Sequence, residues 1–150
     1  MTVSRTWISP PIRLVIGEVW AHIVDDSGAR FEDYRPSIHD DSRWYITALD
    51  GQVAAAFWMR RVNGITWEAH ANVRPKFWGQ KRGTKMCRLA IEEMIRDTGA
   101  RKVVALIPDS SPAVQRMAQA IGFKREGCNK DSWLKNGKLY NQIHYGITRN

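Results

Sequence analysis

The sequence predicts an α+β fold, in which a mixed and mostly antiparallel central sheet is flanked by helices. Three Asp-Gly or Asn-Gly pairs stand between apolar runs, and such a pair is the strongest short-range sign of a β-hairpin. Other stretches carry apolar residues at the spacing of an amphipathic helix. The hairpin pairs are at residues 50–51, 63–64 and 136–137, and the helical patterns cover 11–24, 83–97 and 112–122. This mixture of strands and helices indicates an α+β domain.

The first half of the chain holds one helix and three strands. The helix over 11–24 begins with Pro11, whose missing N–H costs least at a helix start. Residues 25–43 are rich in Asp, Ser, Gly and Pro, and they are expected to form a loop that can include a short helix. Two strands over 44–60 and a third over 65–73 then follow as sequential antiparallel strands.

In the second half, the spacing of the apolar residues first becomes helical and then returns to that of strands. Gly99 and Gly122 are placed to end two helices, and Ser111 is placed to cap the second of them. The short β-branched run 102–108 is typical of a strand that is buried on both faces. The expected elements are a helix over 83–97, a strand over 102–108, a helix over 112–122 and a hairpin of two strands, 125–136 and 139–149.

The composition bounds the class of protein. The 150 residues are 43% hydrophobic and 25% charged, and they include seven Trp, which excludes a disordered chain. No stretch reaches the roughly 20 apolar residues of a membrane span. The N-terminal segment lacks the apolar core of a secretory signal, so we expect a cytoplasmic protein of one domain over residues 1–150. Cys87 and Cys128 form no CxxC pair; we expect reduced, buried thiols and no metal site.

The net charge of +8 is concentrated in the second half of the chain. Residues 1–75 hold 8 Lys or Arg against 9 Asp or Glu, whereas residues 76–150 hold 15 against 6. The densest stretch, 74–88, contains six cations and no acid. Such asymmetry indicates an anionic partner. Nucleic acid, an anionic surface, a phosphorylated small ligand and a merely solvated basic face all fit the charge alone.

The stretch 73–86 joins a strand to a helix through a loop that contains glycine. Such a loop exposes backbone N–H groups, and the helix N-terminus adds positive potential. Lys81 and Arg82 lie within the loop. The stretch is therefore a candidate cradle for a pyrophosphate group.

From residue 44 to residue 148, the order of elements resembles that of the GCN5-related N-acetyltransferases, the GNAT superfamily. The motif Val73-x-Pro75-x-x-x-Gly79, followed by Gly83, is similar to the family's acetyl-coenzyme A motif. The chain looks most like small members encoded by bacteriophages. The resemblance implies a GNAT-like sheet, acetyl-CoA as the cofactor and an amine as the acceptor.

The family's cofactor loop usually reads Arg/Gln-x-x-Gly-x-Gly/Ala, and two alignments are open. The ungapped alignment puts Trp78 at the Arg/Gln position, Lys81 at the middle Gly and Gly83 at the last. A shifted alignment begins at Gln80 and ends at Lys85. In either alignment a lysine replaces a small residue, which obstructs the pyrophosphate or substitutes a side-chain cation for a backbone contact. The resemblance implies cofactor contacts from Val73, Gly79, Gln80, Lys81, Arg82, Gly83, Thr84 and Ser111.

The strand before this loop alternates polar and apolar residues, so one face carries Thr66, Glu68, His70 and Asn72. A polar row on a central strand must line a cleft or find buried partners. A glutamate on this strand is the general base of many GNAT enzymes, and Glu68 resembles it, with His70 as the second candidate. The alternative is that both side chains only hydrogen-bond to neighbouring strands.

The family's general acid is often a Tyr four residues before the Gly of the last helix, and Ala118 stands at that position here. The last strand offers three candidate substitutes, Tyr140, His144 and Tyr145, of which we select Tyr140 together with Glu68 and His70 as the catalytic set. Each of the three also fits a packing role.

These observations predict an acetyl-CoA-dependent N-acetyltransferase, in which an amine attacks the thioester directly and Glu68 takes the proton of the amine. A catalytically silent protein on the same fold, such as a structural protein of a virus particle, is the alternative, because Trp78, Lys81 and Ala118 depart from the family. Nucleic-acid binding through the basic half is a third and less favoured hypothesis.

The acceptor amine is not identified by the sequence. Residues 25–43 and the final hairpin are expected to wall its pocket. No membrane partner is expected, and a homodimer or another protein partner is left open.

Overall fold

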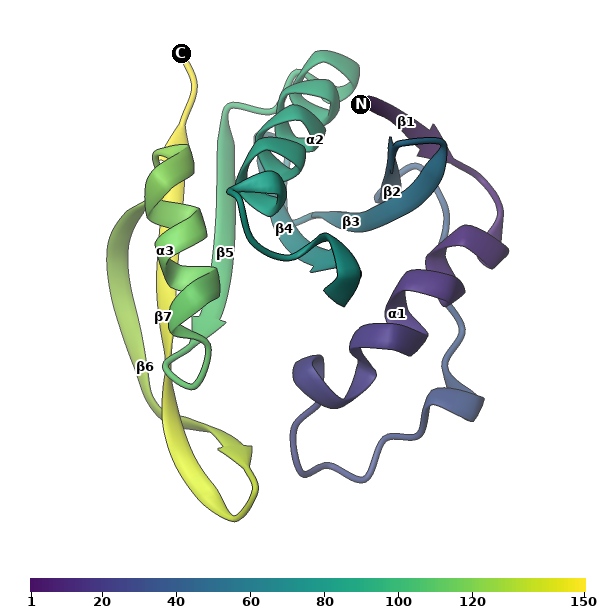
Figure 1. Cartoon of the computed structure of the whole chain (residues 1–150). Coiled ribbons are helices and arrows are strands. Elements are labelled where there is room, and N and C mark those ends of the chain that lie inside the picture. Colours follow the sequence, from purple (N-terminus) through teal and green to yellow (C-terminus); the bar gives the residue numbers. More distant parts are fainter.

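The computed structural model describes residues 1–150 and contains seven strands, three helices and two short 3₁₀ turns (Figure 1). Every expected element is present within two residues of its expected bounds, which confirms the α+β class. The strands are β1 (Thr2–Thr6), β2 (Ser42–Leu49), β3 (Gln52–Arg61), β4 (Thr66–Val73), β5 (Lys102–Pro108), β6 (Lys124–Lys135) and β7 (Lys138–Thr148). The helices are α1 (Ser9–Ile23), α2 (Arg82–Thr98) and α3 (Pro112–Ile121), and the 3₁₀ turns are η1 (Phe31–Asp33) and η2 (Pro75–Phe77).

All seven strands form one sheet in the order β1-β2-β3-β4-β5-β7-β6. Every neighbouring pair is antiparallel except β4 and β5, which run parallel. The turn between β2 and β3 is made by Asp50 and Gly51, which have φ of 53° and 74°. Two positive φ angles in a row are what a tight hairpin turn requires, and Asp-Gly supplies them at low cost.

The parallel pair at the centre of the sheet is short. Thr66, Trp67 and Glu68 pair with residues 102–104, and no pairing follows. Beyond Glu68 the two strands diverge, although β4 stays paired with β3 and β5 stays paired with β7 to their ends. The sheet is therefore divided into two halves that separate from this point onward (Figure 1).

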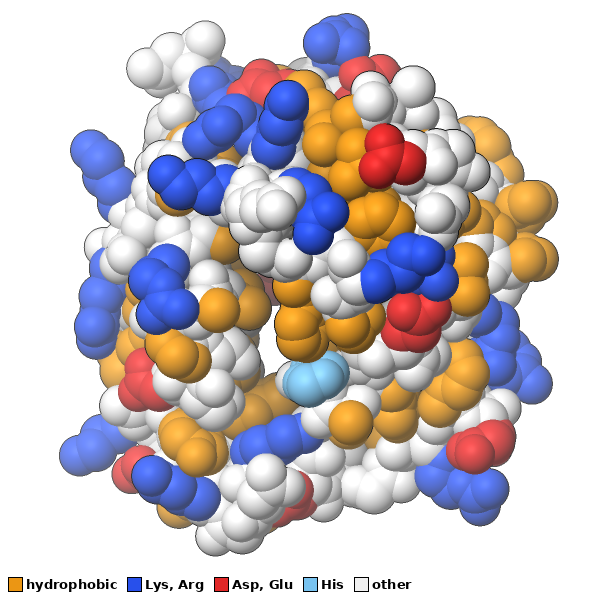
Figure 2. Space-filling model, in the orientation of Figure 1, with side chains coloured by type: hydrophobic (Ala, Val, Ile, Leu, Met, Phe, Trp, Pro, Cys, Tyr) orange, Lys and Arg blue, Asp and Glu red, His pale blue; other side chains and the backbone are white.

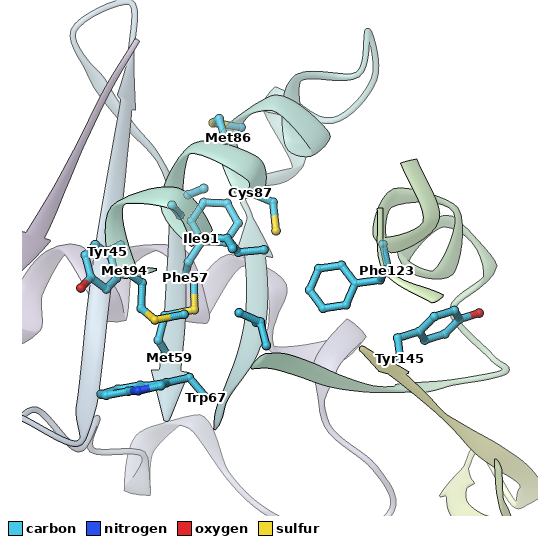
Figure 3. Packing of buried hydrophobic residues seen from close by; sticks show 14 of the residues in the cluster. Tyr45, Phe57, Met59, Trp67, Met86, Cys87, Ile91, Met94, Phe123 and Tyr145 are labelled. Atoms are coloured by element: carbon cyan, nitrogen blue, oxygen red, sulfur yellow. The ribbon is translucent and has the colours of Figure 1, made fainter. Parts of the chain in front are cut away.

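Helices cover both faces of the sheet. On one face, α1 packs Ile12, Val15 and Ile16 against Trp44 and Ile46 of β2. On the other face, α2 contributes Met86, Ile91 and Met94 to a core that also holds Tyr45, Phe57, Met59 and Trp67 from the strands (Figure 3). The same core continues to Phe123 and Tyr145 beside α3 (Figure 3). The alternation of β2 therefore serves two cores, because Trp44 and Tyr45 point to opposite faces.

Two local expectations about strands need correction. The strand β1 was not expected, because TVSRT is short and polar; it is held at the sheet edge by pairing of Thr2–Thr6 with β2. In β5, only Val103 and Ile107 are buried, so the strand is not buried on both faces. Its continuous apolar pattern misleads because a helix, α3, packs on only one of its faces, whereas α1 on the other side packs mainly against β2, β3 and β4.

Two expectations about single residues are confirmed only in part. Cys87 is buried, and burial raises the pKa of its thiol to about 12, but Cys128 is exposed on the edge strand β6. Ser111 does stand at the N-cap of α3, yet its side chain makes no capping hydrogen bond.

No helix combines the length and the hydropathy needed to cross a membrane.

Candidate active site

The edge of β4 beyond Glu68 carries backbone groups without a partner in the sheet. The N–H of Arg74 donates to the carbonyl of Ala54 in β3 at 2.9 Å. Successive residues of a strand direct their backbone groups to opposite edges, so those of Ala71 and Val73 face the gap between β4 and β5. An extended ligand can add to such an edge as an extra strand.

The loop that follows this edge has an unusual backbone. Gly79, Gln80 and Lys81 have φ of 89°, 55° and 59°, three left-handed residues in a row. This conformation favours glycine, so the φ of Lys81 agrees with the alignment that places Lys81 at the family's middle Gly. The loop leads directly into α2, whose first N–H groups have no carbonyl within the helix to bond.

Gly83 lies in the first turn of α2, against the end of β4. A Cβ atom at this position would lie 3.6 Å from Cγ2 of Val73 and 3.6 Å from Sδ of Met117 in α3. A single methyl group fits at these distances, but a branched side chain requires these neighbours to move. The helix N-terminus is therefore packed closely against the strand edge.

The cations of the stretch 74–88 differ in their contacts. Arg74 pairs with Glu18 at 2.9 Å, and Arg88 donates to the carbonyl of Ala120 at 3.0 Å. Lys76 and Arg82 also have partners within the protein. The side chains of Lys81 and Lys85 are exposed and make no hydrogen bond or ion pair. These two lysines are the cations available to an anion at the start of α2.

The indole of Trp78 closes part of the free edge. Its Nε1 donates to the carbonyl of Val73 at 2.7 Å, and its ring packs edge-on against His22 of α1 at a centroid distance of 5.2 Å. The side chain is nonetheless 49% exposed. The carbonyl of Val73 is thus occupied by the indole of Trp78, although about half of that side chain is exposed to solvent.

Glu68 and His70 lie on the same face of β4, at the point where the sheet divides. Nε2 of His70 lies 2.6 Å from Oε1 of Glu68, and Nη2 of Arg60 lies 3.2 Å from Oε2. The hydrogen bond from His70 is the main cause that lowers the pKa of Glu68, with further lowering from the charges of His70 and Arg60 against the effect of burial. Glu68 is therefore ionised at neutral pH.

The hydrogen bond also fixes the roles of the two nitrogen atoms of His70. Since an ionised carboxylate only accepts, Nε2 carries the hydrogen and Nδ1 of the neutral ring is the free acceptor. The side chain of His70 is 38% exposed, against 20% for Glu68. The pair thus presents Nδ1 of His70 as a hydrogen-bond acceptor, and the half-buried carboxylate of Glu68 orients the ring.

A row of three stacked rings runs from this pair across the sheet. His70 stacks on Trp58 of β3 with a centroid distance of 4.7 Å, and Trp58 stacks on Trp44 of β2 at 5.9 Å. The three residues are direct partners in the strand register. Asn72, further along the polar face, is buried and donates to the carbonyl of Ala56 at 3.1 Å. The polar face of β4 therefore finds its partners on β3, in Arg60, Trp58 and the carbonyl of Ala56.

The remaining candidates are placed differently. Tyr140 lies beyond the last residue of β7 that pairs with β5, opposite Trp133 and under Lys138, with no contact to Glu68 or His70. His144 is exposed and pairs with Leu106 of β5. Tyr145 is buried and donates to Oε1 of Gln115 at 2.9 Å. The structure thus brings together Glu68 and His70 but not Tyr140.

Two other positions complete the comparison with the sequence. Ala118, on α3, is buried in the core, and its methyl group cannot act as a general acid. Ser111 stands at the start of α3, at the carboxyl end of β5, and accepts through its carbonyl from the N–H of Gln115.

The open end of the gap is bridged by contacts between the two halves. Nζ of Lys135, at the tip of the β6–β7 hairpin, donates to the carbonyls of Ala21 and Val24 at 2.6 and 2.5 Å. The carboxylate of Asp26 accepts from the N–H groups of Asn136 and Gly137. Figure 2 shows an opening through the molecule below the loop that leads into α2, between the half with β5–β7 and the half with α1. Both expected walls, the segment after α1 and the final hairpin, thus border the gap.

Sequence reasoning missed five residues around the site. Trp58 and Trp44 lie on strands that were expected, and the alternation of β2 and β3 could have placed them on the face of His70 once the register was known. The alternation of β3 could likewise have placed Arg60 beside Glu68. Asp26 and Lys135 are more than 100 residues apart, and nothing in the sequence pairs them.

Comparisons with known proteins agree with this architecture. The model of the acetyltransferase (GNAT) family matches residues 9–123. No curated protein sequence matches the chain significantly. Several hundred solved structures do match the chain, and the three named below are 14–16% identical to it.

Three of these structures show the extent of the likeness. A mutant of spermidine N-acetyltransferase SpeG from Vibrio cholerae is 14% identical, covers 99% of this chain and 95% of its own, and has a TM-score of 0.82. The ribosomal-protein-alanine N-acetyltransferase from Brucella melitensis is 14% identical over 99% of both chains, with a TM-score of 0.76. A GNAT family acetyltransferase from Elizabethkingia anophelis, solved with acetyl-CoA bound, is 16% identical over 98% and 97% of the chains, with a TM-score of 0.73.

At these identities the structures establish the fold, and the family model establishes the relationship. The match covers most of the chain, from α1 to the end of α3. The chain therefore belongs to the GNAT family of acetyltransferases.

Proposed function

We propose that this protein transfers the acetyl group of acetyl-CoA to an amine. The observation that carries the proposal is the division of the sheet after Glu68. It leaves a free strand edge, a helix N-terminus with two unpaired lysines at the end of that edge, and the Glu68–His70 pair beside it. Family membership and the acetyl-CoA bound to a structural neighbour support the same assignment.

The residues around the gap fit this ligand. The N–H and carbonyl groups of Ala71 and Val73 can bond an extended amide-containing arm. The left-handed loop and the first N–H groups of α2 suit a pyrophosphate. The atom that does not fit is the Val73 carbonyl, because the indole of Trp78 already occupies it. The residues expected to line the site are Val73, Gly79, Gln80, Lys81, Arg82, Gly83, Thr84 and, from α3, Ser111.

When bound, acetyl-CoA supplies the acetyl group as a thioester that the amine attacks directly. The N–H of Val73 faces the gap and is placed to donate to an oxygen on which negative charge develops.

The Glu68–His70 pair is proposed to take the proton of the attacking amine. A carboxylate whose pKa is lowered is a weak base, whereas imidazole groups titrate near neutral pH. We therefore assign proton acceptance to Nδ1 of His70 and orientation to Glu68, which stabilises the imidazolium ion. This refines the expectation that Glu68 itself is the base.

The pKa of the acceptor amine determines the free energy that its deprotonation costs. A lysine side chain with a pKa near 10.4 costs about 4.6 kcal/mol to deprotonate at pH 7, whereas an α-amine near 7.8 costs about 1 kcal/mol. No general acid contacts the pair, because Ala118 is buried and Tyr140 is remote. An amine of low pKa is therefore the acceptor class that suits this site.

The proposal is tested by thermal unfolding with acetyl-CoA, desulfo-CoA and inorganic polyphosphate in parallel. A specific ligand at 100 times its dissociation constant stabilises the folded state by about 2.7 kcal/mol. We expect both nucleotide ligands to give this shift and polyphosphate to give much less. Equal shifts with all three would indicate simple anion binding, and no shift with any would favour a catalytically silent protein on the GNAT fold.

A further inference from the structure

A cavity lies on the face of the sheet that carries the Glu68–His70 pair, apart from the gap between β4 and β5. It has a volume of about 150 Å³ and is lined by Tyr34, Arg35, Ser37, Trp44 and Trp58. Trp58 is also the ring on which His70 stacks. The cavity and the proposed proton acceptor are therefore adjacent, joined by one indole.

The two indoles offer the cavity only their apolar surface. Nε1 of Trp58 donates to Oγ of Ser42 at 2.8 Å, and Nε1 of Trp44 donates to the carbonyl of Ser37 at 3.1 Å. With both N–H groups engaged, neither ring has a donor left for a ligand. A planar or aliphatic body is what such walls accommodate.

Arg35 is the one charged residue in the lining. Its Nη1 donates to the carbonyls of Glu32 and Tyr34 at 3.0 and 2.8 Å. These bonds hold the guanidinium group at the cavity, and Nε and Nη2 make no hydrogen bond within the protein. A guanidinium group with two free N–H positions matches a carboxylate or a phosphate.

No negative charge faces the cavity. Burial raises the pKa of Tyr34 to about 12, so its hydroxyl group stays neutral. Glu32 is paired with Arg30 at 3.5 Å, and both oxygen atoms of Glu68 already have partners. A ligand with several positive charges would meet Arg35 in the lining and no carboxylate.

We infer that the cavity is the acceptor subsite and that the acceptor is an amine that also carries a carboxylate or phosphate group. The amine lies at His70, the apolar body lies along Trp58 and Trp44, and the anion binds Arg35. The ring centroids lie 4.7 and 5.9 Å apart, so an acceptor that lies along the row separates its nitrogen from its anion by roughly 7–10 Å. This inference rests on the proposed acetyl transfer, and it separates this chain from the neighbour that is a spermidine N-acetyltransferase.

The experiment uses two small amines that differ only in the anion. 4-(Aminomethyl)benzoate carries an amine and a carboxylate at opposite ends of a flat ring, and benzylamine lacks the carboxylate. Binding of each to the protein saturated with CoA is measured by calorimetry, and acetylation of each with acetyl-CoA gives kcat and KM. We expect the benzoate to bind about tenfold more tightly than benzylamine and spermidine to bind more weakly than either.

Arg35→Met tests the residue that makes the difference. The variant should remove the tenfold advantage of the benzoate by raising its Kd and KM, while benzylamine is unaffected and kcat is retained. Arg125→Met is the matched control, because Arg125 is exposed on the edge strand β6, makes no side-chain hydrogen bond or ion pair and does not line the cavity. Equal affinity of the two amines, retention of the advantage in Arg35→Met, failure of both amines to bind, or preference for spermidine would each overturn the inference.

The same data distinguish this inference from the proposed function. Calorimetry with CoA alone comes first, and if CoA does not bind, the proposed function fails. If CoA binds and amines are acetylated without regard to a carboxylate, only the assignment of the acceptor fails.

Discussion

Nε2 of His70 lies 2.6 Å from Oε1 of Glu68 on one face of β4, directly beside the last residue pair that holds the two halves of the sheet together. The strand register explains this position. Glu68 pairs with Val104, and His70 is the first residue on that face after the pairing ends. The acid–base pair and the free strand edge are thus two consequences of the same break in the sheet.

The indole of Trp78 occupies the Val73 carbonyl at the end of that edge, and Trp78→Phe removes the hydrogen-bond donor while keeping an aromatic ring. We expect CoA to bind two- to tenfold more tightly to the variant, because a ligand no longer competes for the carbonyl with a bond worth about 0.5–1.5 kcal/mol. Calorimetry measures the change. Adenosine 3′,5′-bisphosphate, which lacks the extended arm, should bind unchanged.

Trp7→Phe is the control for that change, since Trp7 is 60% exposed and packs against Arg5 rather than near the edge. Weaker binding of CoA to Trp78→Phe would show that the indole belongs to the bound site and does not compete with the ligand.

Gly83 tests the contact between the first turn of α2 and the strand edge. Gly83→Val adds branched atoms where Val73 and Met117 lie 3.6 Å from the position of a Cβ, and it crowds the N–H groups at the helix start. We expect CoA affinity to fall at least tenfold while the protein remains folded. Calorimetry and circular dichroism of the same samples check both statements.

Gly83→Ala is the matched variant, because a single methyl group meets its neighbours at ordinary contact distance. It should retain most of the affinity and gain helix propensity. If Gly83→Val binds CoA as tightly as the wild-type protein does, phosphate binding at the start of α2 is excluded.

Much of the fold follows from local sequence signals. The Asp50-Gly51 pair imposes a tight turn, and Gly99 and Gly122 end their helices in left-handed conformations, so these boundaries depend on neighbouring residues only. The edge strand β1 has no such signal, since pairing with β2 alone makes TVSRT a strand. Tertiary pairing decides its conformation.

The candidate site divides in the same way. Alternation along β4 places Glu68 and His70 on one face, and this prediction needs nothing beyond the strand itself. The break between β4 and β5 depends on the register of two strands about 30 residues apart, which no residue pattern encodes. The bond from Trp78 to Val73 and the contacts of Lys135 with the end of α1 are likewise products of the folded chain.

The cations at the start of α2 give a prediction about charge. Lys81 and Lys85 have no partner in the protein, and Arg82 adds a third positive charge to the same turn. Replacement of all three by Gln should weaken CoA far more than pantetheine, which has no phosphate. The dependence of CoA affinity on salt should also flatten.

Titrations of both ligands at two salt concentrations measure these effects. A DNA duplex serves as the comparison ligand. If the triple variant loses binding to DNA and binds CoA as before, the basic stretch serves nucleic acid instead.

The pH–rate profile of wild type and Glu68→Gln, with a saturating amine acceptor, tests the central claim most directly. Because the pKa of Glu68 is lowered, Glu68 stays ionised as pH falls through neutrality, while imidazole and amine take up protons and the rate declines. Glu68→Gln keeps the shape and the hydrogen bond to His70 but loses the charge that stabilises its protonated form. We predict a rate at pH 7 lower by about 10²–10⁴-fold, a loss that shrinks as pH approaches the pKa of the amine, and little change in CoA affinity. A variant with the wild-type rate at pH 7 would contradict the account.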